Sequence, residues 1–128
     1  MKHLLIVEDE EELLNLYSLA LVRDGYKVET AKSGQEAILK IKTSPPDLVI
    51  LDIMLPVMNG YHVAQTILQD KTIAKKPKIL FVTGRDTSKE KNLVEFLGAS
   101  GVLEKPFTLD ELKRTVYRIT QGPSLEGK

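Results

Sequence analysis

Three runs of four consecutive apolar residues divide the chain into segments: Leu4–Val7, Leu48–Leu51 and Ile79–Val82. Short continuous runs of this kind, bounded by polar or turn-forming residues, are typical of strands buried on both faces of a parallel sheet. Two weaker patterns mark further strands, Tyr26–Thr30 and Gly101–Glu104. The hydrophobic pattern therefore predicts five strands.

Apolar residues at helical spacing follow each predicted strand, so each strand should lead into a helix. The first helix should end at Asp24, because the next residue, Gly25, is typical of helix C-termini. Asn59 is expected to cap the helix before the fourth strand. Three further helices should begin with capping boxes, at Ser33–Glu36, Thr87–Glu90 and Thr108–Glu111.

This alternation of strands and helices predicts an α/β fold, a doubly wound parallel sheet with helices on both faces. The length of 128 residues suits one domain with a single core. We expect the domain to span residues 1–121. Residues 122–128 have lost helical periodicity and are expected to be a tail or the start of a linker.

Composition excludes several classes of function. The 18 basic and 18 acidic residues give a formal net charge of +0, so no overall charge attracts nucleic acid or an anionic membrane. The absence of cysteine excludes disulfides, a thiol nucleophile and cysteine-ligated zinc. No apolar run approaches the roughly 20 residues of a membrane span, and the first apolar segment is too short for a signal peptide. We expect a cytoplasmic protein that contacts neither nucleic acid nor membrane directly.

Side chains of the kinds used in catalysis stand where four of the predicted strands end. Glu8 and Asp9 follow the first strand, Asp52 the third, Thr83 the fourth and Lys105 the fifth. Since the carboxyl ends of parallel strands share one edge of the sheet, these side chains should meet there. Three converging carboxylates repel one another unless a cation neutralises them. Mg²⁺ suits this place because it prefers carboxylate, carbonyl and water oxygens.

These groups are the parts that phosphoryl transfer requires. A carboxylate can act as nucleophile, and a metal and the Lys105 ammonium can neutralise charge. The Thr83 hydroxyl and the Gly84 N–H can bind phosphoryl oxygens. Each residue alone has an ordinary structural explanation, because Asp often forms turns and the run Glu10–Glu12 suits a helix N-terminus. Their coincidence at four strand ends favours a functional site.

Several short motifs, in their order along the chain, resemble the receiver domains of bacterial two-component response regulators. They are Leu5–Asp9, Leu51–Pro56 with Met58–Gly60, Val82–Gly84, Gly98–Gly101 and Lys105–Phe107. The resemblance covers roughly residues 3–120. It implies a flavodoxin-like fold with the strand order 2-1-3-4-5 that chemotaxis receivers have.

The resemblance also implies a role for each acidic residue. Asp52 would accept a phosphoryl group from a histidine kinase or a histidine phosphotransfer protein. Asp9, Asp52 and the backbone carbonyl of Met54 would hold Mg²⁺, and Glu8 would act through a water molecule. Such a domain is not an enzyme beyond accepting the phosphoryl group and losing it by hydrolysis.

On the phosphate side, the resemblance implies that Thr83 and Gly84 bind phosphoryl oxygens and that Lys105 pairs with the phosphate. The bond from Lys105 to Pro106 would be a cis peptide. Val102 departs from the family, which usually has Tyr or Phe at this position and moves its ring on activation. A β-branched side chain with one favoured rotamer cannot reproduce that movement, so the altered switch position implies a different output.

Two residues flank the expected path of water to the phosphoryl group. Arg85 lies two residues after Thr83, and Met54 lies two residues after Asp52. Our hypothesis is that Arg85 reaches the phosphoryl group and, together with Met54, shields it. The phosphorylated state would then last longer.

The first helix is apolar around more of its circumference than one buried stripe requires. We expect Leu13, Tyr17 and Ala20 to face the core, which leaves Leu14 and Leu21 outside it. These two leucines are either singly exposed residues without a function or a docking patch for a kinase or phosphotransfer helix. Separately, we expect the domain to signal through contact with a downstream protein.

The leading interpretation is a phosphorylation-operated switch consisting of a receiver alone, acting by protein contact or within a phosphorelay. One alternative is a receiver excised from a larger regulator or hybrid kinase. Another is a phosphorylation-independent adaptor on the same fold, which Val102 alone favours. A Mg²⁺-dependent phosphatase of the haloacid-dehalogenase type needs a second Asp where Met54 stands, and insertions that this length does not allow.

Overall fold

The computed structural model describes residues 1–84 and 91–122, and of Lys91 and Leu93 only the backbone. The elements within these residues are β1 (His3–Val7), α1 (Glu11–Arg23), β2 (Lys27–Ala31), α2 (Gly34–Thr43), β3 (Leu48–Asp52), α3 (Gly60–Gln69), β4 (Lys78–Thr83), α4 (Lys91–Phe96), β5 (Gly101–Glu104) and α5 (Leu109–Thr120). All strand pairs are parallel, and the order is β2-β1-β3-β4-β5. The predicted α/β fold and strand order are therefore confirmed.

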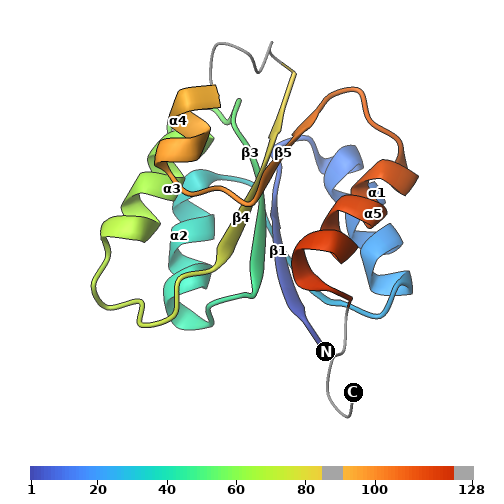
Figure 1. Cartoon of the computed structure of the whole chain (residues 1–128), viewed down its shortest axis with the longest axis horizontal. Coiled ribbons are helices and arrows are strands. Elements are labelled where there is room, and N and C mark those ends of the chain that lie inside the picture. The colour runs from blue at the N-terminus through green and yellow to red at the C-terminus, as the bar shows by residue number, and fades with distance from the viewer. Residues whose placement is uncertain (85–90, 123–128) are drawn as a thin grey trace.

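Helices cover both faces of the sheet: α1 and α5 lie on one face, and α2, α3 and α4 lie on the other (Figure 1). The apolar runs of β1, β3 and β4 are buried along their whole length, since each strand meets a helix layer on both sides. Each face of the sheet has its own hydrophobic core, and successive residues of a strand point to opposite faces. Leu5 and Val7 therefore pack with α2–α4, while Leu4 and Ile6 pack with α1 and α5. Within the described ranges, no helix is long and apolar enough to cross a membrane.

The predicted capping boxes have different outcomes. Thr108 and Glu111 form a reciprocal box at the start of α5, as predicted. At α2 the Ser33 hydroxyl accepts the Glu36 N–H at 3.1 Å, which is the expected first half. The Glu36 carboxylate, however, accepts the N–H of Lys32 at 2.9 Å, one residue further toward the N-terminus than a capping box requires.

Other helix ends follow the sequence signals. The Asn59 side chain caps α3 by accepting the His62 N–H at 3.0 Å. Asp24 is the C-cap of α1, and Gly25 follows it with a φ of 97°, a backbone conformation that favours glycine. The predicted box Thr87–Glu90 lies outside the described residues.

The strand β2 begins at Lys27, one residue later than predicted. The reason is that Tyr26 belongs to the turn that ends α1, because its N–H donates to the Leu21 carbonyl at 3.2 Å. The Tyr26 ring is buried, and its hydroxyl lies 3.3 Å from the Thr120 hydroxyl of α5. Tyr26 therefore packs this corner of the chain against α5.

The buried face of α1 also differs from the prediction. Leu14 and Leu21 are 3% and 0% exposed, so the expectation that they form a docking patch is wrong. With Tyr17 they are spaced by three and four residues, which places all three on one stripe of the helix. Leu13 lies beside this stripe and is only half-buried. The apolar residues that α1 exposes are instead Leu16, Leu19 and Val22.

Candidate functional site

Three carboxylates meet at the edge of the sheet where its strands end, and we call them the carboxylate cluster: Glu8, Asp9 and Asp52. Asp52 is the last residue of β3 and is buried. Glu8 directly follows β1 and is buried too, whereas Asp9 is exposed. One oxygen from each of the three lies within 4.8 Å of the others.

Lys105 joins the cluster from the loop after β5. Its ammonium lies 3.2 Å from Glu8 Oε1 and 3.3 Å from Asp52 Oδ2, so one cation serves two buried anions. Its backbone N–H donates to the Thr83 carbonyl at 2.7 Å, and its peptide bond to Pro106 is cis. Partial burial of Lys105 disfavours its charged form, but the attraction of Asp52 and Glu8 outweighs this and raises the pKa of the ammonium.

Backbone N–H groups fix the remaining oxygens of the buried carboxylates. The Met54 N–H donates to Asp52 Oδ1 at 2.9 Å, and the Glu10 N–H donates to Glu8 Oε2 at 3.1 Å. Burial raises the pKa of Glu8, the Glu10 N–H opposes this, and the charge of Asp52 adds to the increase. Each buried carboxylate is thus held at one oxygen by the backbone and at the other by Lys105.

The loop after β3 is closely packed against the end of that strand. The Gly60 N–H donates to the Ile53 carbonyl at 3.0 Å. A Cβ at Gly60 would lie 2.6 Å from the Asp52 carbonyl oxygen and 2.9 Å from the Ile53 Cα. Only glycine fits this place, because backbone atoms cannot yield as a flexible side chain can.

The other residues predicted for the site occupy different settings. Thr83 ends β4 and is fully buried, while Gly84 is exposed and a Cβ there would meet no atom of the described residues within 4 Å. Met54 is 52% exposed beside the cluster. Val102 is half-buried and packs against the core under α2–α4. Arg85 lies outside the described residues.

The donor set fits a hard divalent cation. The carboxylate cluster carries three acidic groups, and Lys105 is the ammonium paired with two of them. The site therefore has more negative than positive charge, and part of it is buried. Mg²⁺ can neutralise this excess because it prefers oxygen ligands.

Sequence reasoning missed one residue beside this cluster, Tyr17. The prediction placed it in the core, where it is 7% exposed, but gave it no part in the site. Its ring contacts that of Phe107, with centroids 5.4 Å apart and planes tilted by 31°. Burial raises the pKa of Tyr17, the charge of Lys105 opposes this, and the charges of Glu8 and Asp52 add to the increase. The position of Tyr17 in the sequence, relative to Glu8 and Asp9, did not indicate that it lies close to the carboxylate cluster.

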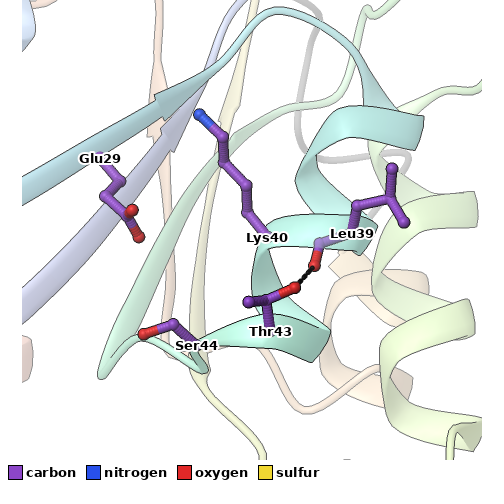
Figure 2. A pocket seen from close by; sticks show the side chains of 5 residues that line it. All are labelled: Glu29, Leu39, Lys40, Thr43 and Ser44. Atoms are coloured by element: carbon purple, nitrogen blue, oxygen red, sulfur yellow. Dashed lines mark hydrogen bonds between the residues drawn. The ribbon is translucent and has the colours of Figure 1, made fainter.

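A hollow of about 170 Å³ between the edge strand β2 and α2 is a different kind of place (Figure 2). Three of its polar side chains are already bound within the chain. Glu29 is hydrogen-bonded to the His3 ring at 2.8 Å, Lys40 lies 3.2 Å from Glu36, and the Thr43 hydroxyl donates to the Leu39 carbonyl. This hollow offers no set of converging groups comparable to the carboxylate cluster.

A five-stranded parallel sheet that gathers three carboxylates and a lysine at its strand ends defines the receiver class of signalling domain. The chain matches the family model for the response regulator receiver domain over residues 4–117, and it belongs to that family.

Similar proteins are found among both sequences and structures. The alkaline phosphatase synthesis transcriptional regulatory protein PhoP of Bacillus subtilis is 39% identical over 132 residues, covering 99% of this chain and 54% of PhoP. Chemotaxis response regulator CheY4 of Vibrio cholerae superposes with a TM-score of 0.85 at 31% identity, covering 93% of this chain and 98% of that one. The non-phosphorylated HemR receiver domain from Leptospira biflexa gives 0.84 at 34% identity, covering 93% and 94%. The chain spans about half the length of the curated relatives it matches.

Proposed function

We propose that this chain is a phosphorylation-operated switch in which Asp52 accepts a phosphoryl group from a phosphohistidine donor. The donor would be a histidine kinase or a histidine phosphotransfer protein. One observation carries the proposal: Asp52 is buried at a strand end, with one oxygen bonded to the Met54 N–H and the other 3.3 Å from the Lys105 ammonium. The set of groups around it is the one that phosphoryl transfer to a carboxylate needs.

In the transfer step, a carboxylate oxygen of Asp52 forms a bond to phosphorus while the bond from phosphorus to the donor's imidazole nitrogen breaks. The electron pair of that broken bond stays on the imidazole, which then takes up a proton. Burial of Asp52 supports this role, because a site with little water protects an acyl phosphate from hydrolysis.

Asp9, Asp52 and the backbone carbonyl of Met54 would hold Mg²⁺, with Glu8 acting through a water molecule. When bound, Mg²⁺ neutralises the carboxylates and the charge of the incoming phosphoryl group. Support comes from the close approach of the three carboxylates and from the excess of negative charge that Lys105 leaves.

Lys105 holds Asp52 and Glu8 before transfer and pairs with a phosphoryl oxygen afterwards. Thr83 and Gly84 supply a hydroxyl and an N–H for the other oxygens, since Thr83 ends the strand that pairs with the strand of Asp52 and Gly84 follows it. These three residues give the phosphorylated aspartate its binding partners.

Two features would set the lifetime and the output of the phosphorylated state. Met54 is half-exposed at the cluster and would shield the phosphoryl group together with Arg85, for which the proposal rests on sequence position alone. Val102 has no ring to move, so the signal would leave the site by a route other than an aromatic residue in β5. We expect Arg85→Ala to speed dephosphorylation, and an unchanged rate would remove Arg85 from the proposal.

The partner would dock on the exposed stripe of α1, formed by Leu16, Leu19 and Val22, which are 46%, 53% and 51% exposed. These residues are spaced by three, so they lie along one side of the helix that starts beside the carboxylate cluster. Residues 1–121 would act as the receiver, and residues 122–128 as a tail or the start of a linker. Because the chain matches 54% of PhoP, it could act as a receiver alone or as the receiver of a longer regulator.

Mass measurement of the intact protein tests the proposal. After incubation with Mg²⁺ and acetyl phosphate, we expect the wild type to gain the mass of one phosphoryl group and Asp52→Asn to gain none. Asp70→Asn is the matched control, because Asp70 lies in the turn after α3 and outside the carboxylate cluster. No adduct on the wild type, together with no Mg²⁺ binding, would favour a phosphorylation-independent adaptor. An adduct on Asp52→Asn would mean that another residue is the acceptor.

A further inference from the structure

An aromatic pair connects α1 to the loop that carries Lys105. Tyr17, in the middle of α1, is 7% exposed, and its ring centroid lies 5.4 Å from that of Phe107. The planes are tilted by 31°, and the separation of the centroids lies in the range that aromatic pairs favour. Phe107 is only half-buried and packs on the core between the sheet and α1.

Phe107 follows Lys105 by two residues in the same loop. Lysine carries its charge on a flexible four-carbon stem, and the position of its backbone sets the region that the ammonium can reach. On one side the Lys105 N–H is bonded to the Thr83 carbonyl at 2.7 Å. On the other side, two residues along the chain, Phe107 is held by the ring of Tyr17. The backbone of Lys105 therefore lies between two anchors.

Tyr17 is also electrostatically close to the site. The charges of Lys105, Glu8 and Asp52 all act on its hydroxyl, although burial is the main reason that its pKa is raised. The hydroxyl therefore stays neutral at neutral pH. The ring of Tyr17 contacts the loop of Lys105, and its hydroxyl is close enough to Glu8 and Asp52 to be affected by their charges.

We propose that Tyr17 is a positioning residue for phosphoryl transfer: its ring, packed against Phe107, fixes the loop that holds the Lys105 ammonium between Glu8 and Asp52. This inference rests on the proposed function of Asp52. It assigns to α1, which is also the proposed docking helix, a direct mechanical connection to the lysine of the site.

The competing explanation is that Tyr17 only fills the core between α1 and the sheet. Tyr26 offers a matched comparison, because it belongs to the same hydrophobic core and is 4% exposed. Its hydroxyl contacts Thr120, at the end of α5 and away from the carboxylate cluster. Loss of either ring should lower stability, but only loss of Tyr17 should change the reaction.

The test measures the rate of phosphorylation by acetyl phosphate at saturating Mg²⁺ for folded variants. We expect Tyr17→Leu to slow the reaction roughly two- to tenfold, the range to which the orienting energy of an aromatic pair corresponds. Tyr17→Phe keeps the ring and should react at the wild-type rate. Tyr26→Leu should lower the melting temperature and leave the rate unchanged.

A second pair of variants tests the route through Phe107. We expect Phe107→Leu to slow phosphorylation like Tyr17→Leu, and the double variant to be no slower than either single one, since both remove the same contact. A wild-type rate in Tyr17→Leu, or an equal loss in Tyr26→Leu, would overturn the inference while leaving Asp52 as acceptor. Absence of phosphorylation in the wild type would overturn the proposed function itself.

Discussion

At the scale of single residues, the site depends on an imbalance of charge. Glu8 and Asp52 are buried and share one ammonium, while Asp9 adds a third carboxylate at the surface. Burying two anions is costly unless each is hydrogen-bonded, and here the Met54 and Glu10 N–H groups meet that need. The folded state is therefore prepared for one more cation.

This imbalance predicts that Mg²⁺ stabilises the fold. A ligand that binds only the folded state raises its stability by about 2.7 kcal/mol at 100 times its Kd. We expect Mg²⁺ to raise the melting temperature of the wild type and EDTA to reverse the increase. Asp9→Asn should remove the effect, whereas Glu12→Gln should retain it, because Glu12 is exposed but outside the carboxylate cluster. Retention of the effect in Asp9→Asn would point to general screening instead.

A second residue-scale prediction concerns acid stability. Hydrogen bonds from the Thr72 hydroxyl and N–H, and the ion pair with Lys42, lower the pKa of Asp70 to about 2. A lowered pKa means that this carboxylate stabilises the fold above pH 4 and that the contribution is lost as the pH falls toward 2. In urea unfolding, Asp70→Asn should therefore be less stable than wild type at pH 5 and approach it near pH 2. A difference that is independent of pH would contradict the assignment.

The sequence predicted the chemistry of the site better than its surroundings. Glu8, Asp9, Asp52 and Lys105 were expected to meet because all four follow strands of one parallel sheet, and the structure brings them together. Tyr17 was missed because its contact with the site runs through Phe107, on a loop about 90 residues away in the chain. Only the packing of α1 on the sheet creates that proximity.

At the scale of elements, α1 shows where hydrophobic periodicity fails. Between Leu13 and Val22 nearly every residue is apolar, so several stripes satisfy the spacing of a helix and the pattern alone cannot choose among them. Packing against the sheet and α5 makes the choice, burying Leu14 and Leu21. The strands β1, β3 and β4 were predictable because a continuous apolar run needs no choice of face.

The turn from β3 into α3 allows a prediction about glycine. Gly60→Ala would bring a Cβ to 2.6 Å from the Asp52 carbonyl oxygen, so the end of β3 must shift. We expect a loss of about 1–3 kcal/mol in the free energy of unfolding and slower phosphorylation of Asp52. For stability, the control is Gly84→Ala, where the added methyl group meets nothing within 4 Å among residues 1–84 and 91–122. Equal stabilities of the two variants would show that the loop adapts more freely than its packing implies.

At the scale of the whole molecule, the carboxylate cluster and two helix-capping lysines lie at opposite edges of the sheet. The acidic groups of the carboxylate cluster lie where the strands end. At the opposite edge the helices end, and there Lys76 donates to the Ile67 carbonyl of α3 and Lys78 to the Ile119 carbonyl of α5. These lysines are placed to stabilise the negative ends of the helix dipoles, while the other edge holds the acidic carboxylate cluster.

The central claim concerns this acidic edge: Asp52 is the residue that receives the phosphoryl group. The most direct test is to treat the protein with Mg²⁺ and acetyl phosphate, reduce it with borohydride, and sequence its peptides by mass spectrometry. Borohydride converts an aspartyl phosphate to homoserine, so the modified position is marked permanently. The account predicts homoserine at Asp52 alone and none when Mg²⁺ is removed. Homoserine at Asp9 or at any other aspartate, with Asp52 unmodified, would contradict it.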